Sequence, residues 1–410
     1  MAVAALLPGG VDARPTHHHD NKNDGFVKVN EDGTGFTRFG KPYMIRGANY
    51  WQGINLGAEE CFGGDRERME TEIKQMADMG ISNVRVMAAS EGPDDQPYRM
   101  RPSLMYKPGE YREEIFVGLD YLMDVLDRYN MTAVMTLNNF WHWSGGFSQY
   151  VAWITGDENI PYPVNNTGWD EFTAYTAQFY NNSDIAPTAQ KIYKDHIKTL
   201  ANEPQQGPAW WFEETGTFIK ELAPNHLVSV GLESKEDEFD FLRAHDHDVI
   251  DYTTCHLWVE NRGVYDPSKE DSINDALTYG ADFLTKTSGW AVDLGKPIVM
   301  EEFGMARDAW LQPNNLTFKY DPATPTAHKD EFFGALFDQI VGFAKKGQFS
   351  GSNFWAYSGM GRSTDYPNKY GMVWLGDPPH EPRGWYGVYD KDTTAKVISK
   401  YNSELQELEK

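Results

Sequence analysis

Cysteine is scarce in this chain of 410 residues, and its scarcity excludes several classes of protein. The two cysteines, Cys61 and Cys255, are too few for a disulfide framework or for a zinc site with four cysteine ligands. One disulfide between them stays open, but we expect two buried thiols. The sequence also lacks any apolar run near the roughly 18 residues that a membrane-spanning helix requires.

Positive charge is also in short supply. Lysine and arginine number 37 against 61 aspartates and glutamates, so the net charge is −24. Such a chain would repel DNA, RNA or an anionic membrane, so we expect no nucleic-acid partner, no membrane partner and a neutral or cationic substrate. Aromatic residues make up 14% of the chain. Uncharged sugars bind flat aromatic faces well, although a tryptophan-rich core would explain the same composition.

The order of apolar patterns predicts the fold. Residues 1–24 carry a short apolar run and a polar stretch, and we expect a disordered tail there. From residue 25 onward, short apolar runs alternate with apolar residues at helical spacing, without an internal repeat. The runs predict strands buried on both faces at 43–48, 82–87, 132–137, 227–231, 249–255, 297–301 and 351–355. This order favours one (β/α)8 barrel over 25–410, with a doubly wound sheet as the alternative.

Function collects at the carboxyl ends of the strands in such a barrel. Two of these ends carry glutamates 99 positions apart, Glu203 in the sequence ANEP and Glu302 in EEFG. Glycoside hydrolysis requires one carboxyl group that donates a proton and a second that is ionised. A single glutamate is more often a surface ion-pair partner, but two at strand ends beside aromatic residues indicate this chemistry. His142, in the segment LNNFWHWSGG, is expected at the rim.

These motifs together resemble glycoside hydrolase family five, in the clan of retaining (β/α)8 glycosidases, and within it the endo-β-1,4-mannanases. The resemblance runs from about residue 25 to the C-terminus. It rests on NYWQG (49–53), NVRVMA (83–88), LNNFWHWSGGFSQYVAW (137–153), ANEP and EEFG. It implies that Glu203 is the acid/base and Glu302 the nucleophile. It also implies the substrate-binding residues Arg85, Asn202, His256 and Trp355. No motif in the sequence calls for a metal or a cofactor.

Independently of the resemblance, the aromatic faces of Trp51, Trp141 and Trp258 would extend the platform along a chain substrate, with core packing or rim filling as an equal alternative. Asn138, at the end of a predicted strand, is a further candidate for substrate binding.

The resemblance assigns particular roles within this set. Asn202 corresponds to the residue that holds the sugar 2-hydroxyl, and Trp355 to the platform under the sugar. Arg85 near Glu302 would keep that carboxylate ionised, and the charge of Glu302 would in turn raise the pKa of Glu203. Strand alternation predicts that Glu301 and Glu302 point in opposite directions. Alternation alone does not say which one faces the site, and the resemblance selects Glu302.

The fourth strand is missing from this pattern. The residues before Asn202, AQKIYKDHIKTLA, place apolar side chains at helical spacing. Relatives carry a further segment between such a helix and the Asn-Glu dipeptide. Either residues 196–201 form a short fourth strand, or the barrel is open and two strand edges are unpaired. An open barrel would loosen the mount of Glu203. A displacement of about 1 Å can cost on the order of a hundredfold in rate.

We therefore expect an endo-acting retaining hydrolase of β-1,4-mannosidic bonds whose partner is mannan or glucomannan. The alternatives are a related β-1,4-glucanase or transglycosylase, and a non-catalytic carbohydrate-binding barrel. We expect a monomer that is secreted, extracellular or periplasmic, with a signal peptide upstream of or overlapping MAVAALL. A mechanism that retains the anomeric configuration predicts a separation of roughly 5–5.5 Å between the carboxyl groups of Glu203 and Glu302. If residues 191–200 instead form one helix, with no strand before Asn202, the family assignment still holds. In that case we would not expect this chain to be an active hydrolase.

Overall fold

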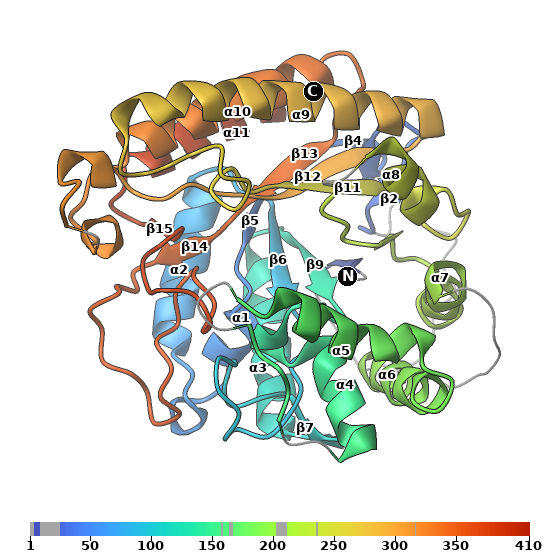
Figure 1. Cartoon of the computed structure of the whole chain (residues 1–410). Coiled ribbons are helices and arrows are strands. Elements are labelled where there is room, and N and C mark those ends of the chain that lie inside the picture. Colours follow the sequence, from blue (N-terminus) through green and yellow to red (C-terminus); the bar gives the residue numbers. More distant parts are fainter. Residues whose placement is uncertain are drawn as a thin grey trace.

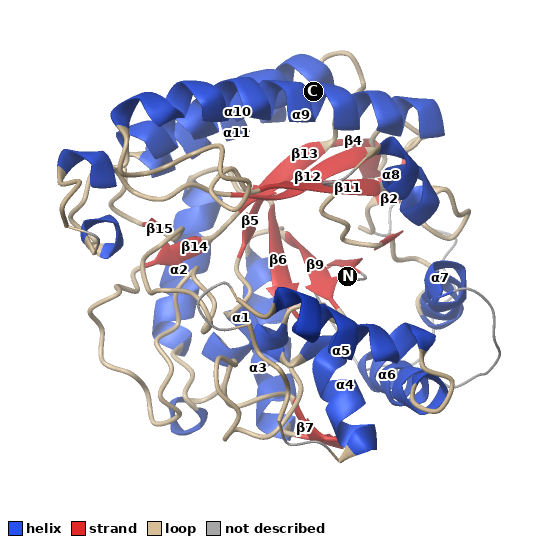
Figure 2. Ribbon diagram, in the orientation of Figure 1, coloured by secondary structure: helices blue, strands red, loops and turns tan. Residues whose placement is uncertain are grey.

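The computed structural model describes residues 4–8, 25–156, 159–163, 167–201, 211–234, 237–315 and 317–410. An eight-stranded curved sheet forms its centre, and the helices lie around the outside (Figures 1 and 2). Six of the strands run parallel in the order β9-β6-β5-β13-β12-β11. They are β5 (Ile45–Asn49), β6 (Asn83–Met87), β9 (Thr132–Thr136), β11 (Thr253–Leu257), β12 (Ile298–Phe303) and β13 (Gly351–Phe354).

These strands confirm the prediction of apolar runs buried on both faces. Every residue of β5, β6, β9, β11 and β13 is buried. Because the strands are parallel, their carboxyl ends meet at one edge of the sheet, as the predicted (β/α)8 barrel requires. A small antiparallel sheet contacts the opposite end, where Phe36 and Tyr43 pack with Tyr252 and Val299. Its strands are β2 (Lys28–Val29), β3 (Phe36–Arg38) and β4 (Lys41–Tyr43).

The helices follow the predicted apolar spacing. The carboxylate of Asp65 caps the start of α2 by accepting a hydrogen bond of 3.0 Å from the backbone N–H of Arg68. Helix α9 ends at Gly295, whose φ of 66° suits a residue without a side chain. Helices α9, α10 and α11 lie side by side along one face of the sheet (Figure 1). Helices with this spacing are α2 (Arg66–Asp78), α3 (Glu113–Arg128), α7 (Trp211–Leu222), α9 (Ile273–Leu294), α10 (Ala327–Ala344) and α11 (Thr394–Glu407).

The remaining elements occupy the connections. The helices are α1 (Gly53–Leu56), α4 (Gly146–Thr155), α5 (Trp169–Asn181), α6 (Ala186–Ala201) and α8 (Glu238–His245). The short strands are β7 (Met105–Lys107), β8 (Glu110–Tyr111), β14 (Tyr357–Gly359) and β15 (Val388–Tyr389). Both cysteines are free. Cys255 is buried as expected, but Cys61 is exposed, so the prediction of two buried thiols was wrong for Cys61. Within the described ranges, no helix combines the length and apolar character needed to cross a bilayer.

An antiparallel strand occupies the position of the fourth barrel strand. Strand β1 (Ala4–Pro8) lies between β9 and β10 (Val228–Ser229) and runs antiparallel to both. Its Cα partners extend from Thr136 opposite Ala4 to Thr132 opposite Pro8, and the short blue strand Ala4–Pro8 is drawn beside β9 (Figure 1). The expectation of a disordered tail was therefore wrong for Ala4–Pro8. The other residues of 1–24 lie outside the described part of the chain.

The residues expected to supply a fourth strand are helical. Helix α6 continues to Ala201, so the first of the two alternatives, a short strand over 196–201, was wrong, and no described strand leads into Asn202. The physical reason is that the apolar side chains of this segment lie at helical spacing, so that a helix buries Tyr193 and Ile197 on one face. The edges of β9 and β10 carry backbone N–H and C=O groups that still require partners. Strand β1 supplies them from a distant part of the sequence. On the other side of β10, the backbone N–H of Asp251, just before β11, donates to the carbonyl of Val228 (2.9 Å). This hydrogen bond connects β10 with the start of β11 in the barrel.

Candidate active site

Two carboxylates, a guanidinium and an imidazole meet at the carboxyl end of β12. Arg85 donates from Nη1 to Oε1 of Glu302 at 2.6 Å, and its Nε lies 3.5 Å from Oε2 of Glu301. His256 places Nδ1 at 3.3 Å from Oε2 of Glu302 and Nε2 at 3.8 Å from Oε2 of Glu301. The structure thus brings together Arg85, His256 and Glu302 from β6, β11 and β12, as the sequence predicted.

Both carboxylates reach the same cluster because of an irregularity in the strand pairing. Cys255 pairs with Met300, but the next residue, His256, pairs with Glu302, so Glu301 is an extra residue on β12. Such a bulge locally breaks the alternation of side chains and changes the direction in which one of them points. The expectation that Glu301 and Glu302 point in opposite directions was therefore wrong.

The two glutamates differ in their exposure. Glu301 is 0% exposed, whereas the side chain of Glu302 is 15% exposed. Burial by itself would raise the pKa of Glu301, but the charge of Arg85, followed by His256, outweighs it and holds this pKa below its ordinary value. The hydroxyl of Tyr252 also donates to Glu301, at 3.2 Å. Glu301 is therefore a buried counter-ion of Arg85, and Glu302 is the carboxylate that a substrate can reach.

Arg85 is itself held in place. Its Nη1 donates to Oδ1 of Asn49 at 2.9 Å, while Nδ2 of Asn49 donates to the carbonyl of Glu301 at 2.8 Å. Burial lowers the pKa of Arg85, but the neighbouring charges of Glu301 and Glu302 outweigh this effect, so the pKa is raised. The cation is therefore permanent and stabilises the ionised form of the carboxylate beside it.

Three tryptophans surround the end of β13. The backbone N–H of Trp355 donates to the carbonyl of Phe303 at 2.8 Å, which places Trp355 beside the end of β12. Its ring meets those of Trp143 and Trp258 edge-on, with centroids 6.2 and 6.0 Å away. Trp355 and Trp258 thus form an aromatic wall, whereas Trp51 is buried behind Trp143 and donates from Nε1 to the carbonyl of Gly376.

Two predicted binding residues, Trp141 and Asn138, have no described contact with the carboxylate cluster, and two further predicted site residues lie outside the described ranges. Trp141 is half-buried and packs edge-on against Trp169 at 5.4 Å, and no described contact joins it to Glu302. Asn138 is fully buried, and its Oδ1 accepts a hydrogen bond from the N–H of the next residue. Asn202 and Glu203 lie outside the described residues, and so does the predicted separation between Glu203 and Glu302.

Sequence reasoning missed the segment 376–387, which follows β14 and borders this site. The ring of His380 is parallel to that of Trp143, with centroids 6.4 Å apart, and meets the ring of His142 at 5.2 Å. Burial, followed by the charges of Asp377 and Glu302, raises the pKa of Glu381 well above its ordinary value. The signal that could have found it is the aromatic and acidic sequence DPPHEPRGWYG (377–387), which lies downstream of the last predicted strand, 351–355.

His142 also differs from expectation. It is 1% exposed rather than at the rim. Burial, followed by the nearby charge of Arg99, lowers its pKa to about 4, so the imidazole is neutral at neutral pH. His142 thus joins the 137–146 and 376–387 segments through its contact with His380.

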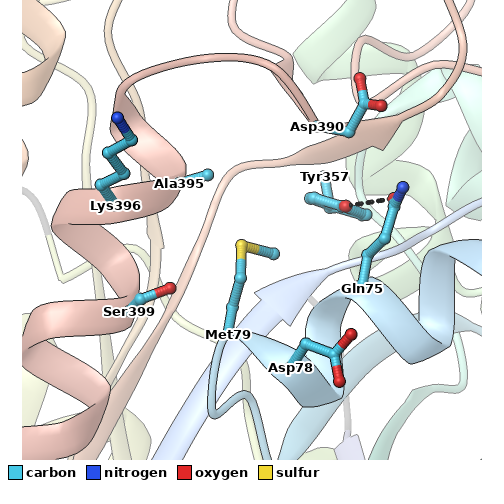
Figure 3. A pocket seen from close by; sticks show the side chains of 8 residues that line it. All are labelled: Gln75, Asp78, Met79, Tyr357, Asp390, Ala395, Lys396 and Ser399. Carbon is cyan, nitrogen blue, oxygen red and sulfur yellow. Dashed lines mark hydrogen bonds between the residues drawn. The ribbon is translucent and has the colours of Figure 1, made fainter.

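A separate hollow lies on the outside of the barrel. Its volume is about 380 Å³, and it lies between α2, β14 and α11, where Tyr357 donates a hydrogen bond to Gln75 (Figure 3). None of its lining residues belongs to the carboxylate cluster. In the described part of the chain, no group of three or more histidine, cysteine, aspartate or glutamate side chains is placed to hold a metal ion.

The fold and the site define a glycosidase built on a (β/α)8 barrel. Residues 24–203 and 199–410 match a family model described as GH family 5 beta-mannosidase-like, so the chain belongs to glycoside hydrolase family 5. The two matched segments meet at 199–203, the place where the sequence pattern predicts a missing segment.

Known proteins agree with this assignment. The chain is 63% identical to the family 5 mannosidase of Rhizomucor miehei, with a TM-score of 0.91 over 94% of this chain and 98% of that one. It is 26% identical to mannan endo-1,4-beta-mannosidase 5 of Solanum lycopersicum, over 90% of this chain and 89% of that protein. The endo-beta-1,4-mannanase of Thermotoga petrophila shares the fold, with a TM-score of 0.60, 19% identity, and coverage of 89% of this chain and 77% of that one.

Two solved structures of the Rhizomucor miehei mannosidase are glutamate-to-alanine variants. The replaced glutamates lie 99 positions apart in that protein. Glu203 and Glu302 have the same separation. One of these variants was solved in complex with mannosyl-fructose.

Proposed function

We propose that this protein cleaves β-mannosidic bonds with retention of configuration and that Glu302 is the nucleophile. The observation that carries the proposal is the position of the Glu302 carboxylate, which is held between Arg85 and His256 and remains partly exposed. An ionised, oriented carboxylate at the carboxyl edge of a barrel is what the first displacement requires.

The proposed reaction has two steps. A carboxylate oxygen of Glu302 bonds to the anomeric carbon as the glycosidic bond breaks, and the leaving oxygen takes a proton from the acid. Water then attacks the glycosyl-enzyme, releases Glu302 and returns a proton to the same residue, now acting as base. We assign the acid/base role to Glu203, by its resemblance to the family and by the matching separation of 99 residues.

The observed helix divides the proposal into two halves. Because α6 runs to Ala201, no described strand leads into the Asn202-Glu203 pair, although an active hydrolase is expected to carry this pair at a strand end. The nucleophile half of the site is assembled among described residues, and the acid half depends on Glu203. We therefore propose that Glu302 attacks the anomeric carbon. Whether this chain also hydrolyses an unactivated polysaccharide, which requires the acid, is tested by experiment. A carbohydrate-binding barrel without turnover is the second candidate, and the unbroken α6 favours it.

A substrate with an activated leaving group separates the two halves. Dinitrophenolate departs without a proton, so the first step on 2,4-dinitrophenyl β-mannoside tests Glu302 alone, whereas the first step on β-mannan also requires the acid. We expect the protein to release dinitrophenolate and Glu302→Gln to abolish the release. Glu203→Gln should keep a rapid burst of about one equivalent, followed by slow turnover, because the second step still requires the base. Glu331→Gln, an exposed charge on α10, is the matched control.

The outcomes are distinct. If the Glu302→Gln variant still turns over the activated mannoside, Glu302 is not the nucleophile. Release from the activated mannoside without hydrolysis of mannan would place the defect at the acid. No release from either substrate, together with mannooligosaccharide binding by calorimetry, would establish the carbohydrate-binding alternative.

The size of the substrate is a further part of the proposal. The sequence favoured internal cleavage of mannan, but the family description is beta-mannosidase-like and the 63% identical protein is named a mannosidase. The 376–387 segment also borders the cluster, since the charge of Glu302 acts on Glu381. These observations favour short substrates or chain ends as a second candidate. Mannohexaose distinguishes them, because stepwise release of mannose indicates end cleavage and mixed oligosaccharides indicate internal cleavage.

A further inference from the structure

A lysine is buried beneath the segment that borders the site. Lys329 on α10 is 0% exposed, and its Nζ donates to the carbonyls of Tyr386 (3.0 Å) and Gly387 (3.3 Å). Burial, followed by the charge of Arg307, lowers its pKa to about 8. A buried ammonium group is costly unless its hydrogen bonds are satisfied. An apolar residue would pack at this position without that cost, so the two backbone contacts call for an explanation.

A carboxylate holds the same turn through its N–H groups. Asp377 accepts hydrogen bonds from the backbone of Gly384 (2.9 Å), Tyr386 (2.5 Å) and Gly387 (3.1 Å). Gly384 has a φ of +87°, so the turn also needs a residue without a Cβ there. A cation therefore binds the carbonyls of this turn while an anion binds its amides.

The turn positions one wall of the site. The ring of Tyr386 packs against Trp258 with centroids 4.9 Å apart, and its hydroxyl donates to Asn261 at 3.2 Å. Trp258 in turn meets Trp355. The neighbouring Trp385 donates from Nε1 to Glu260 at 2.9 Å. Movement of residues 384–387 would therefore shift the aromatic wall beside the end of β12.

We propose that Lys329 and Asp377 are positioning residues for substrate recognition, which act by fixing the turn 384–387 and through it Tyr386 and Trp258. Neither residue belongs to the carboxylate cluster. The inference rests on the proposed function for its effect on substrate, while its effect on the turn is independent of any activity.

The test measures the turn and the substrate separately. Lys329→Met keeps the length of the side chain and removes the ammonium group, and Asp377→Asn removes the carboxylate charge. We expect each change to speed amide exchange at Gly384, Tyr386 and Gly387 by about tenfold or more, because each removes hydrogen bonds that hold the turn. Exchange within α10 should stay as it was. Lys345→Met, at the exposed end of the same helix, should leave amide exchange unchanged both in the turn and within α10.

The kinetic readout separates positioning from general damage. With the activated mannoside, both variants should raise KM several-fold and change kcat less, because Glu302, Arg85 and His256 lie on other elements. If the parent protein turns over no substrate, the dissociation constant of mannobiose replaces KM, so a failure of the proposed function leaves this test intact. Unchanged exchange at 384–387, or unchanged KM and binding in both variants, would overturn the proposal. If Lys329→Met does not fold, Asp377→Asn decides.

Discussion

Glu301 and Glu302 are consecutive residues whose carboxylates both contact the guanidinium of Arg85, at 3.5 and 2.6 Å. The bulge on β12 makes this arrangement possible, and it gives the two glutamates different environments. Glu301 is sealed against Arg85 and Tyr252, while Glu302 is open to solvent on one side. Substitution at the two positions should therefore have different consequences.

We expect Glu302→Gln to reduce turnover of the activated mannoside by about 10³-fold or more, since residues that act as a unit in catalysis show losses of this size. Folding and oligosaccharide binding should be largely kept. Glu301→Gln should affect turnover less and the free energy of unfolding more, by about 2–4 kcal/mol, because it breaks a buried ion pair. Initial rates and urea unfolding check both. A larger loss of turnover at Glu301 than at Glu302 would reverse the assignment.

The second prediction concerns pH. Glu91 is 1% exposed, accepts from the N–H of Gly146 (3.0 Å) and from the hydroxyl of Tyr150 (3.2 Å), and supports the start of α4. Burial raises its pKa to about 7, against an ordinary value of 4.5. A raised pKa means that the folded state prefers the protonated form. Its contribution is therefore complete below about pH 4.5 and is lost as the pH rises through about 7.

Glu91→Gln isolates this effect, because glutamine resembles the protonated carboxyl group. The shift corresponds to about 3 kcal/mol. We expect the variant to lose less stability than the parent protein between pH 5 and pH 8 in urea unfolding. The control variant Glu331→Gln should show the same pH dependence of the free energy of unfolding as the parent protein. Parallel pH curves for the parent and Glu91→Gln would show that Glu91 does not titrate in this range.

The third prediction tests strand β1. Leu6 is the Cα partner of Val134, and residues directly opposite in an antiparallel pair are about 4.5–5.5 Å apart at Cα, within the range of a disulfide. Leu6→Cys with Val134→Cys, in a Cys61→Ser background, should therefore form an intrachain disulfide. The off-register pair of Leu6→Cys with Met135→Cys should form it poorly. Mass spectrometry of non-reduced peptides detects the bond, and its absence in the register pair would remove β1 from this position.

Export remains a prediction. A polysaccharide substrate does not cross a membrane, so we propose that the protein is secreted with a signal peptide upstream of or overlapping MAVAALL. Cleavage beyond residue 8 would remove β1 and expose the edges of β9 and β10. N-terminal analysis of protein recovered from the culture medium of the native host tests this. A native product retained in the cytosol would contradict it.

The sequence predicted the parts of the fold that depend on local pattern. Short apolar runs such as 132–137 became buried strands, because a strand covered on both faces needs apolar residues throughout. Apolar spacing also predicted the helix α6. It also indicated that a strand was absent before Asn202. What would fill the gap was not predictable, because β1 pairs with β9 across more than a hundred residues of sequence.

At the site, the sequence by itself determined which residue types stand at the strand ends, and hence the chemistry that Arg85, His256 and Glu302 can perform. Only the tertiary structure decided which of two adjacent glutamates is sealed and which is open, because a bulge changes side-chain direction without any local sequence signal. It also decided that Lys329 and Asp377, 48 positions apart, hold one turn beside the site. Local pattern reports what each segment prefers, whereas contacts between distant segments depend on how the barrel closes.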